Sequence, residues 1–192
     1  RFITDMEISV PGVHNVYNTL AVFAALDIKR MHPEQMCDYF KTFSGMGRRF
    51  QKVAEFNGVR VIDDYAHHPE EIKTTLSGLT SYKGGRVIAV FQPHRFSRLK
   101  SLWKDFLGAF DTVDKLIVTD VYHACEKPIN GINSANFVKD MHHKDCKYVA
   151  GDMETVAREL YPELQSGDLV ITLGAGTCLL YTSPSPRDRT RS

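Results

Sequence analysis

Short apolar runs and helix-spaced apolar patterns follow one another through most of the chain. The runs are rich in the β-branched and aromatic residues typical of strands, and they lie at residues 50–56, 59–63, 86–91, 115–119, 147–150 and 169–173. Apolar positions three and four residues apart predict helices after Pro69, at about 99–110, from a Ser134 cap to 141, and at 153–164. This alternation predicts an α/β fold: a doubly wound sheet with helices on both faces.

The first part of the chain has a purely helical pattern. Residues 14–26 are rich in Ala and Leu and predict a largely buried helix, and an apolar stripe predicts a second helix at about 33–43. The tetrapeptide Ser-Gly-Met-Gly at residues 44–47 then interrupts the pattern with turn chemistry. We therefore expect one domain to end at residue 46 and a separate α/β domain to occupy residues 47–177.

The two ends of the chain are unusual. Residues 178–192 consist mostly of Ser, Thr, Pro and Arg and show no apolar periodicity, which is typical of disorder. We expect this segment to be a non-native appendage. The chain also lacks an initiator Met, which predicts that it begins inside a longer protein.

Composition and charge argue against several classes of protein. The 192 residues are 43% hydrophobic and 24% charged with a net charge of +1, whereas a nucleic-acid-binding domain usually carries a strong basic excess. No apolar run approaches the roughly 20 residues of a membrane span. The four cysteines form no CxxC pair, and His142-His143 lacks further ligands at suitable spacing. We therefore expect a cytoplasmic protein with reduced thiols and no metal site, and neither nucleic acid nor a membrane as partner.

The densest group of polar chemistry follows the strand at 59–63. The stretch Asp-Asp-Tyr-Ala-His-His-Pro at residues 63–69 leads from that strand into a helix, with Pro69 suited to the first helical turn. In open α/β sheets, ligands bind at the carboxyl ends of strands, where this turn lies. Its carboxylates, phenol and imidazoles can recognise hydroxyls, handle protons or contact phosphate. The alternative is an acidic helix cap with surface histidines.

Two more turns carry candidate chemistry after strands. Gln-Pro-His-Arg at residues 92–95 follows the strand at 86–91. Gly-Ala-Gly at 174–176 follows the strand at 169–173, but no third glycine completes a dinucleotide fingerprint. We expect these glycines to let backbone pass close to a binding crevice.

Polar pairs near the starts of two elements are further candidates. Arg48 and Arg49 enter a predicted strand and should point to opposite faces, so that one of them reaches a ligand. Asn15 and Asn18 lie three residues apart and share a helix face. Their amides can offer donors and acceptors to a flat heterocycle such as adenine, or one can cap the helix while the other faces solvent.

Six stretches, spread in order over residues 10–177, together resemble the Mur ligases, the ATP-dependent amino-acid-adding enzymes of peptidoglycan synthesis. The stretches lie at residues 14–18, 47–50, 63–69, 91–95, 122–131 and 174–176. Asp-Asp-Tyr-Ala-His-His-Pro and Phe-Gln-Pro-His-Arg resemble the branch of this family that adds L-alanine.

The resemblance implies three domains: a UDP-sugar-binding domain, a central P-loop ATPase domain and a Rossmann-like C-terminal ligase domain. Residues 1–46 would be the helical C-terminal part of the central ATP-binding domain, and residues 47–177 the Rossmann-like domain. The chain contains no GxxxxGK[ST] stretch. The resemblance implies ATP and Mg²⁺ as partner and cofactor. Because the chain lacks the P-loop stretch, the magnesium ligands and the UDP-sugar site are expected mainly upstream, in the N-terminal domains.

The implied reaction joins L-alanine to UDP-N-acetylmuramate through an acyl phosphate. By motif position, Asn15 and Asn18 would contact adenine. Arg49 would reach the phosphates, with Arg48 less well placed, and Asp64 would bind the ribose hydroxyls. The substrates would be bound by Tyr65, His67, His94, Arg95 and Arg98. Three of these residues would also be catalytic, namely His67, His94 and Arg95.

Two other functions stay open at this point. One is a non-catalytic Rossmann-like module that binds a nucleotide or an anionic sugar, and the other is the related murein tripeptide-recycling ligase. The sequence also leaves open whether the amino acid is L-alanine, glycine or L-serine.

Overall fold

A computed structural model describes residues 4–9, 13–43, 47–80 and 82–176, with the side chain of His14 left out. The chain divides into two compact units, with the boundary between Gly47 and Arg48, and each unit is described here by itself. The tail expected to be disordered, residues 178–192, lies outside the described residues. None of the helices in these ranges is both long and apolar enough to cross a lipid bilayer.

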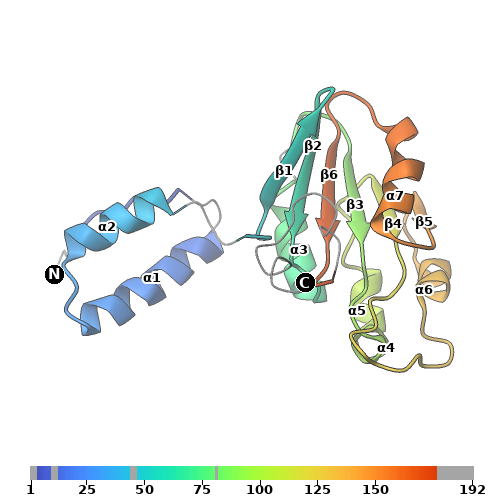
Figure 1. Cartoon of the computed structure of the whole chain (residues 1–192), viewed down its shortest axis with the longest axis horizontal. Coiled ribbons are helices and arrows are strands. Elements are labelled where there is room, and N and C mark those ends of the chain that lie inside the picture. The colour runs from blue at the N-terminus through green and yellow to red at the C-terminus, as the bar shows by residue number, and fades with distance from the viewer. Residues whose placement is uncertain (1–3, 10–12, 44–46, 81, 177–192) are drawn as a thin grey trace, which may run out of the picture. The chain divides into compact units, whose positions relative to one another are not determined.

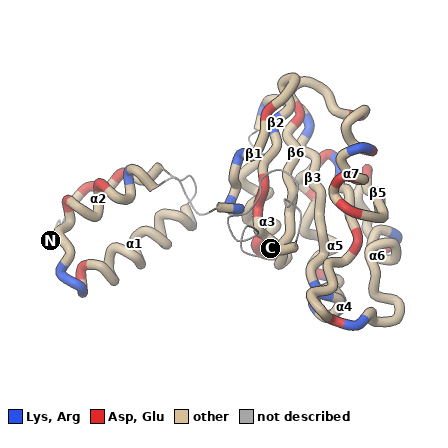
Figure 2. The backbone as a smooth tube through the Cα atoms, viewed as in Figure 1, with Lys and Arg blue, Asp and Glu red and all other residues tan. Residues whose placement is uncertain are grey.

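The first unit contains two helices, α1 (Val13–Ile28) and α2 (Pro33–Thr42), which pack on each other. Figure 2 shows α1 as almost free of charge, whereas α2 carries both signs. The expectation that residues 14–26 form a largely buried helix is wrong for this chain, because Tyr17 and Leu20 are 68% and 50% exposed. The ten-residue α2 is too short to cover the sixteen-residue α1, so apolar surface of α1 stays uncovered within the described part of this unit.

The second unit is built on one six-stranded sheet, which confirms the predicted α/β fold (Figure 1). Its strands are β1 (Gln51–Phe56), β2 (Val59–Asp64), β3 (Val87–Phe91), β4 (Lys115–Val118), β5 (Cys146–Tyr148) and β6 (Leu169–Leu173). Their order across the sheet is β1-β2-β6-β3-β4-β5. β1 and β2 form an antiparallel hairpin, and the other pairings are parallel. Five strands therefore end at one edge of the sheet, here called the carboxyl edge.

Helices connect the parallel strands. They are α3 (Pro69–Ser77), α4 (Phe96–Ser101), α5 (Trp103–Leu107), α6 (Ser134–Asp140) and α7 (Met153–Leu160), the last followed by the 3₁₀ helix η1 (Tyr161–Glu163). Pro69 occupies the first turn of α3, as its missing N–H favours. The helix expected at about 99–110 instead begins at Phe96 and is divided at Leu102, whose ψ of 19° lies outside the helical range.

Two helix ends also differ from expectation. Asn133, not Ser134, caps α6, because the Asn133 side chain accepts a hydrogen bond of 2.8 Å from the Asn136 N–H. The helix expected at 153–164 ends at Leu160. Pro162 has no N–H to donate within a continued helix, so the chain tightens into η1.

Different helices cover the two faces of the sheet, because buried side chains alternate along each strand. All five residues of β3 are buried. Ala89 and Phe91 belong to a core shared with α3, α4, α5 and α6, whereas Ile88 and Val90 belong to a smaller core shared with α7. The chain thus moves from β2 to β5 over one face and returns through α7 to β6 over the other, which makes the sheet doubly wound.

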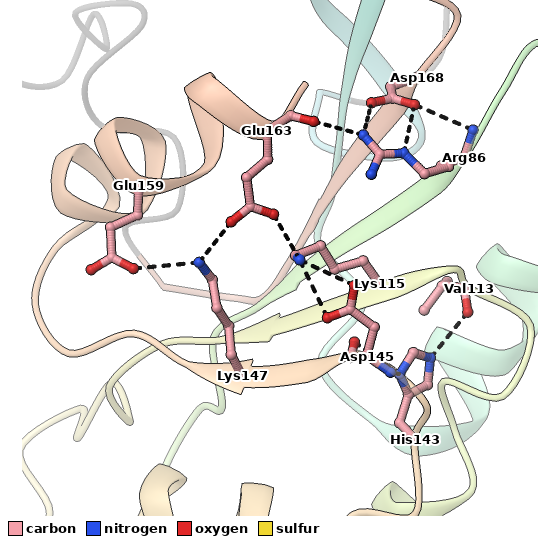
Figure 3. A network of polar contacts seen from close by, with 9 residues as sticks. All are labelled: Arg86, Val113, Lys115, His143, Asp145, Lys147, Glu159, Glu163 and Asp168. Atoms are coloured by element: carbon pink, nitrogen blue, oxygen red, sulfur yellow. Dashed lines mark hydrogen bonds and ion pairs between the residues drawn. The ribbon is translucent and has the colours of Figure 1, made fainter. Parts of the chain in front are cut away.

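Ion pairs join the strands near their amino ends (Figure 3). The Arg86 guanidinium donates to both carboxylate oxygens of Asp168, at 3.1 and 2.6 Å, and to the Glu163 carbonyl at 2.8 Å. The Lys115 ammonium contacts the carboxylates of Glu163 at 2.7 Å and Asp145 at 3.1 Å. The network therefore ties β3, β4 and β6 to η1 at the edge opposite the carboxyl edge.

Replacing Arg86 with Met should destabilise the second unit by about 3 kcal/mol, because the Asp168 side chain is 2% exposed and would remain buried without its partner. Burial raises the pKa of Asp168, but the hydrogen bonds from Arg86 and the Gln165 amide outweigh it and lower the pKa. The contribution of the ionised Asp168 to folding stability is therefore present at pH values above the ordinary carboxyl pKa. It is lost as pH falls through the lowered pKa of Asp168 in the folded state. Urea unfolding at neutral and acidic pH measures both effects.

Arg158→Met is the matched control for this experiment. Arg158 pairs with Glu154 on the surface of α7, with side chains that are 75% and 59% exposed. Its loss should change stability by less than about 0.5 kcal/mol. Equal effects of Arg86→Met and Arg158→Met would show that the buried pair does not stabilise the sheet.

Candidate functional site

Polar and aromatic residues gather at the carboxyl edge over four neighbouring strands, β2, β6, β3 and β4. The turns that follow these strands lie at residues 65–68, 174–176, 92–95 and 119–123. Because parallel strands end side by side, residues far apart in the sequence are neighbours here. Ligands bind at this position in open α/β sheets.

Asp64 ends β2 and holds the turn that follows it. One carboxylate oxygen accepts a hydrogen bond of 2.8 Å from the Phe50 N–H, and the other accepts one of 2.8 Å from the Ala66 N–H. Asp64 is only 4% exposed. Its carboxylate therefore fixes the backbone just before β1 and just after β2, and its expected contact with ribose stays a prediction.

Asp63 is fully buried and bridges three segments of the unit. Its carboxylate accepts hydrogen bonds from Thr172 Oγ1 on β6, at 2.6 Å, and from Arg48 Nε, at 3.0 Å. Arg48 also donates through Nη2 to the Gly174 carbonyl at 2.8 Å. Burial raises the pKa of Asp63, and the hydrogen bonds from Thr172 and Arg48 only partly offset that rise.

The two arginines do not point to opposite faces of a strand. Arg48 and Arg49 lie in a turn before β1 begins at Gln51, so the alternation of strand side chains does not apply to them. Both guanidinium carbons lie over the ring of Tyr65, at 5.1 and 5.6 Å from its centroid. Arg48 is held by Asp63, whereas Arg49 forms no ion pair within the described ranges.

Four rings lie in a row along the carboxyl edge, and we call them the ring row: Tyr65, His67, His94 and Tyr122. Successive centroids are 5.2, 5.7 and 5.4 Å apart. The first two rings follow β2, the third follows β3 and the fourth follows β4. The structure thus brings together Tyr65, His67 and His94, which the sequence predicted, and adds Tyr122.

His67 is oriented by its own turn. Its Nδ1 lies 2.9 Å from the Tyr65 carbonyl and 3.6 Å from Glu71 Oε2. The Glu71 carboxylate also accepts hydrogen bonds from the backbone N–H groups of His67 and His68. Burial raises the pKa of Glu71, but these bonds and the charges of His67 and Arg49 outweigh it and lower the pKa. The acidic helix cap considered as an alternative therefore exists, and it also orients a histidine of the ring row.

The surroundings of His94 favour the neutral form of its imidazole. Burial lowers its pKa, and the nearby charges of Arg98, His67 and Arg95 lower it further, against a small opposing effect of Glu126. Arg98 Nη1 lies 3.3 Å from His94 Nδ1. Because a guanidinium can only donate, Nδ1 accepts, and the N–H of the neutral ring is at Nε2.

Arg95 lies beside His94 in a strained backbone conformation. Its φ is +73°, which non-glycine residues rarely adopt, and it caps α4. Its N–H donates to the Tyr122 carbonyl at 2.8 Å, and its side chain is exposed. An unusual backbone angle held by a neighbouring loop is typical of a functional turn.

The predicted adenine residues lie in the other unit. Asn15 and Asn18 are both on α1, Asn15 half-buried and Asn18 exposed. The two units are described separately, so the role of these amides stays a prediction. No group of three His, Cys, Asp or Glu residues that could hold a metal ion occurs among the described residues.

Backbone passes close to the ring row where β6 ends. Gly174 has φ +153°, and a Cβ at Gly176 would lie 2.9 Å from Tyr122 Cγ. Only glycine fits such an approach without displacing the ring. The sequence did indicate Tyr122 as a candidate, since it follows a buried strand as the other site residues do. The order of the strands in the sheet was needed to show which residues it contacts.

Comparison with known proteins identifies the second unit. The family described as "Mur ligase, glutamate ligase domain" matches residues 48–176. The chain belongs to the Mur ligase family. Among relatives of known name, it is 42% identical over 178 residues to UDP-N-acetylmuramate–L-alanine ligase of Caldanaerobacter subterraneus subsp. tengcongensis, covering 92% of this chain and 38% of that protein. The same enzyme of Rickettsia felis is 41% identical over 181 residues, covering 91% and 38%.

Solved structures of Mur ligases agree with this assignment. The crystal structure of UDP-N-acetylmuramate-alanine ligase from Thermotoga maritima matches with a TM-score of 0.70 and 25% identity, over 96% of this chain and 39% of that one. A murein peptide ligase from Psychrobacter arcticus shares the fold, with a TM-score of 0.63 at 20% identity, over 89% and 36%. The chain thus spans about two fifths of the length of the curated Mur ligases that it matches.

In this Mur ligase domain, Arg48→Met should cost about 3 kcal/mol of folding stability, because it leaves the Asp63 carboxylate buried and unpaired. In the variant, the folded-state pKa of Asp63 rises further. The stability deficit should therefore be largest at neutral pH and shrink as pH falls below that raised value. Adding Asp63→Asn should recover a large part of the loss. Denaturant unfolding of the two single variants and the double variant tests this coupling.

Arg60→Met serves as the control for the same cycle. Arg60 is an exposed arginine of β2 that lies over the Tyr82 ring, 5.2 Å from its centroid. Its replacement should have a small effect that Asp63→Asn does not change. Additive effects of Arg48→Met and Asp63→Asn would contradict the assigned pair.

Proposed function

We propose that this chain is the C-terminal part of an ATP-dependent ligase that joins L-alanine to UDP-N-acetylmuramate in peptidoglycan biosynthesis. The relatives that carry this name match the chain along more than nine tenths of its length. The stretches at 63–69 and 91–95 form the carboxyl edge, which fits this branch of the family. We place the ligase in the cytoplasm, where ATP and UDP-linked sugars are available.

The observation that carries the proposal is the combination of a row of rings and cationic side chains at one sheet edge. Arg49, Arg95 and Arg98 border the ring row, while His94 remains neutral. Such an arrangement can bind phosphate and carboxylate groups and stabilise negative charge that develops during a reaction.

The proposed reaction has two steps. The muramate carboxylate attacks the γ-phosphorus of ATP, which forms an acyl phosphate and releases ADP. The alanine amine, after losing a proton, then attacks the acyl carbon, and the tetrahedral intermediate expels phosphate as the amide forms. Both steps place negative charge on oxygen atoms, which cations and N–H donors in a closed site stabilise.

We assign roles in this reaction to five residues of the carboxyl edge. Arg95 and Arg98 hold the alanine carboxylate, and the Nε2–H of His94 donates to oxygen atoms that gain negative charge. Tyr65 and His67 border the space between alanine and the γ-phosphate.

The nucleotide contacts are assigned to residues of both units. Arg49 lies over Tyr65 without an ion pair in the described ranges, which leaves its guanidinium available for phosphate. Asn15 and Asn18 are assigned to adenine, and Asp64 to ribose. The carboxylate of Asp64 already accepts two backbone hydrogen bonds, so its remaining lone pairs would make the ribose contact.

Magnesium is expected to be held mainly upstream of this segment. Mg²⁺ prefers oxygen ligands in octahedral geometry, often carboxylates together with substrate phosphates. No cluster of three candidate ligands occurs in the parts of the chain that the structure describes. We therefore assign no step of the reaction to a metal bound by these residues.

Arg95→Lys in the complete ligase should raise the KM for L-alanine strongly. Lysine cannot reproduce two parallel N–H···O bonds to a carboxylate. Losing a charge-assisted hydrogen bond should lower kcat/KM for alanine about ten- to a hundredfold. Steady-state kinetics with each substrate varied in turn measure this, with glycine and L-serine as competing amino acids.

The KM for ATP should change little, because adenine, ribose and phosphates are assigned to other residues. Arg60→Lys, an exposed arginine of β2, is the control and should leave both constants unchanged. Unchanged alanine kinetics for Arg95→Lys, or a defect mainly in ATP binding, would remove Arg95 from the amino-acid site.

Residues 1–177 alone should neither hydrolyse ATP nor form the amide. The chain contains no GxxxxGK[ST] stretch to cradle the phosphates. An assay of phosphate release and of alanine incorporation on the purified segment tests this. Ligation by the segment that persists through purification would overturn the assignment of ATP chemistry to upstream domains.

A further inference from the structure

The loop that follows β4 grips the turn that follows β3. The Tyr122 N–H donates to the Pro93 carbonyl at 2.8 Å, and the Arg95 N–H donates to the Tyr122 carbonyl at 2.8 Å. These two bonds form an isolated parallel bridge between His94 and Tyr122. Backbone of residues 93–95 is therefore fixed by a segment almost thirty residues further along the chain.

The side chain of Tyr122 covers His94. The two rings are stacked, with centroids 5.4 Å apart and planes inclined by 17°. On another side, the Tyr122 ring leaves no room for a Cβ at Gly176. The ring is thus held between His94 and the backbone after β6, and it shields one face of the imidazole.

Glu126, at the other end of this loop, holds the start of α4. Its carboxylate accepts hydrogen bonds from the Ser97 N–H at 3.0 Å and from Ser97 Oγ at 2.6 Å. Arg95, with its strained φ of +73°, lies between these bonds and those of Tyr122. The loop therefore fastens the backbone on both sides of Arg95.

We propose that Tyr122 and Glu126 are positioning residues, which hold the His94–Arg95 turn in the geometry that the site requires. Tyr122 sets the orientation of the His94 ring and excludes water from it, and Glu126 keeps Arg95 in its strained conformation. Neither residue is assigned a contact with substrate. The catalytic consequence rests on the proposed ligase function, whereas the structural consequence can be measured in this chain without activity.

The two residues affect His94 in opposite directions. The groups that face His94 are Arg98 and Arg95 from its own turn and α4, His67 from the turn after β2, and Tyr122 and Glu126 from the loop after β4. Removing the Tyr122 ring admits water and should raise the pKa of His94. Removing the negative charge of Glu126 leaves the arginines less compensated and should lower it.

A titration of the 192-residue chain followed by NMR tests this difference. The ring signals of His94 are recorded against pH in wild type, Tyr122→Leu, Tyr122→Phe and Glu126→Gln. We expect a higher pKa in Tyr122→Leu, a wild-type value in Tyr122→Phe and a lower one in Glu126→Gln. Tyr161→Leu, which removes a tyrosine stacked on Phe56, is the control and should leave His94 unchanged.

An unchanged pKa of His94 in both Tyr122→Leu and Glu126→Gln would overturn the proposal. If Tyr122→Leu fails to fold, amide hydrogen exchange measured in Glu126→Gln tests the positioning role in its place. We expect faster exchange at the Ser97 and Arg95 amides relative to the amides of β3. Exchange at wild-type rates would contradict a positioning role for Glu126.

Kinetics of the complete ligase provide the functional readout. A small displacement of a catalytic group can cost up to about a hundredfold in rate, so Tyr122→Leu should lower kcat/KM for L-alanine about ten- to a hundredfold. Tyr122→Phe should restore it, and the KM for ATP should stay within about twofold. Absence of ligase activity in the wild-type protein would refute the proposed function but not the positioning role. Full activity of Tyr122→Leu would refute the positioning role but not the proposed function.

Discussion

The carboxyl edge depends on one buried carboxylate, that of Asp63. It is fully buried and joins Arg48, from the turn before β1, to Thr172 on β6. Arg48 then reaches the Gly174 carbonyl, so a single guanidinium fixes the ends of β2 and β6. Arg48 thereby links the turn that carries it and Arg49 to both strands, and the Tyr65 N–H also holds this turn by donating to the Arg48 carbonyl at 2.7 Å. Burying this charge has an energetic cost, seen in the raised pKa of Asp63, which the hydrogen bonds from Thr172 and Arg48 only partly offset.

Burial and charge act together at the ring row. Burial penalises the charged form of His94, and the charges of Arg98 and Arg95 would repel a protonated ring, so the neutral imidazole is favoured. The remaining positive charge is on guanidinium groups, which cannot lose it. The edge therefore combines permanent cations with a neutral N–H donor, a combination suited to anions whose charge increases during a reaction.

Much of this fold follows from local pattern. Residues 87–91 are apolar throughout because β3 is buried on both faces, and Pro69 could begin a helix because its missing N–H is not needed there. The helix division at Leu102 had no such signal, since neither Gly nor Pro marks it. The apolar composition of α1 predicted burial, but burial depends on what covers a helix. For the candidate site, the sequence marked turns after strands, and Tyr65, His67 and His94 do lie together. It could not show that Tyr122 completes the row, because that depends on β4 lying beside β3.

The second unit holds the carboxyl edge together by contacts of its own. Each unit is compact by itself, and the carboxyl edge is fixed internally by Asp63 and by the loop after β4. Because these contacts order the turns before any ligand binds, little binding energy is needed to order the site residues one by one. Such a preorganised edge presents guanidinium groups and N–H donors in positions that need not be rearranged when negative charge develops beside them.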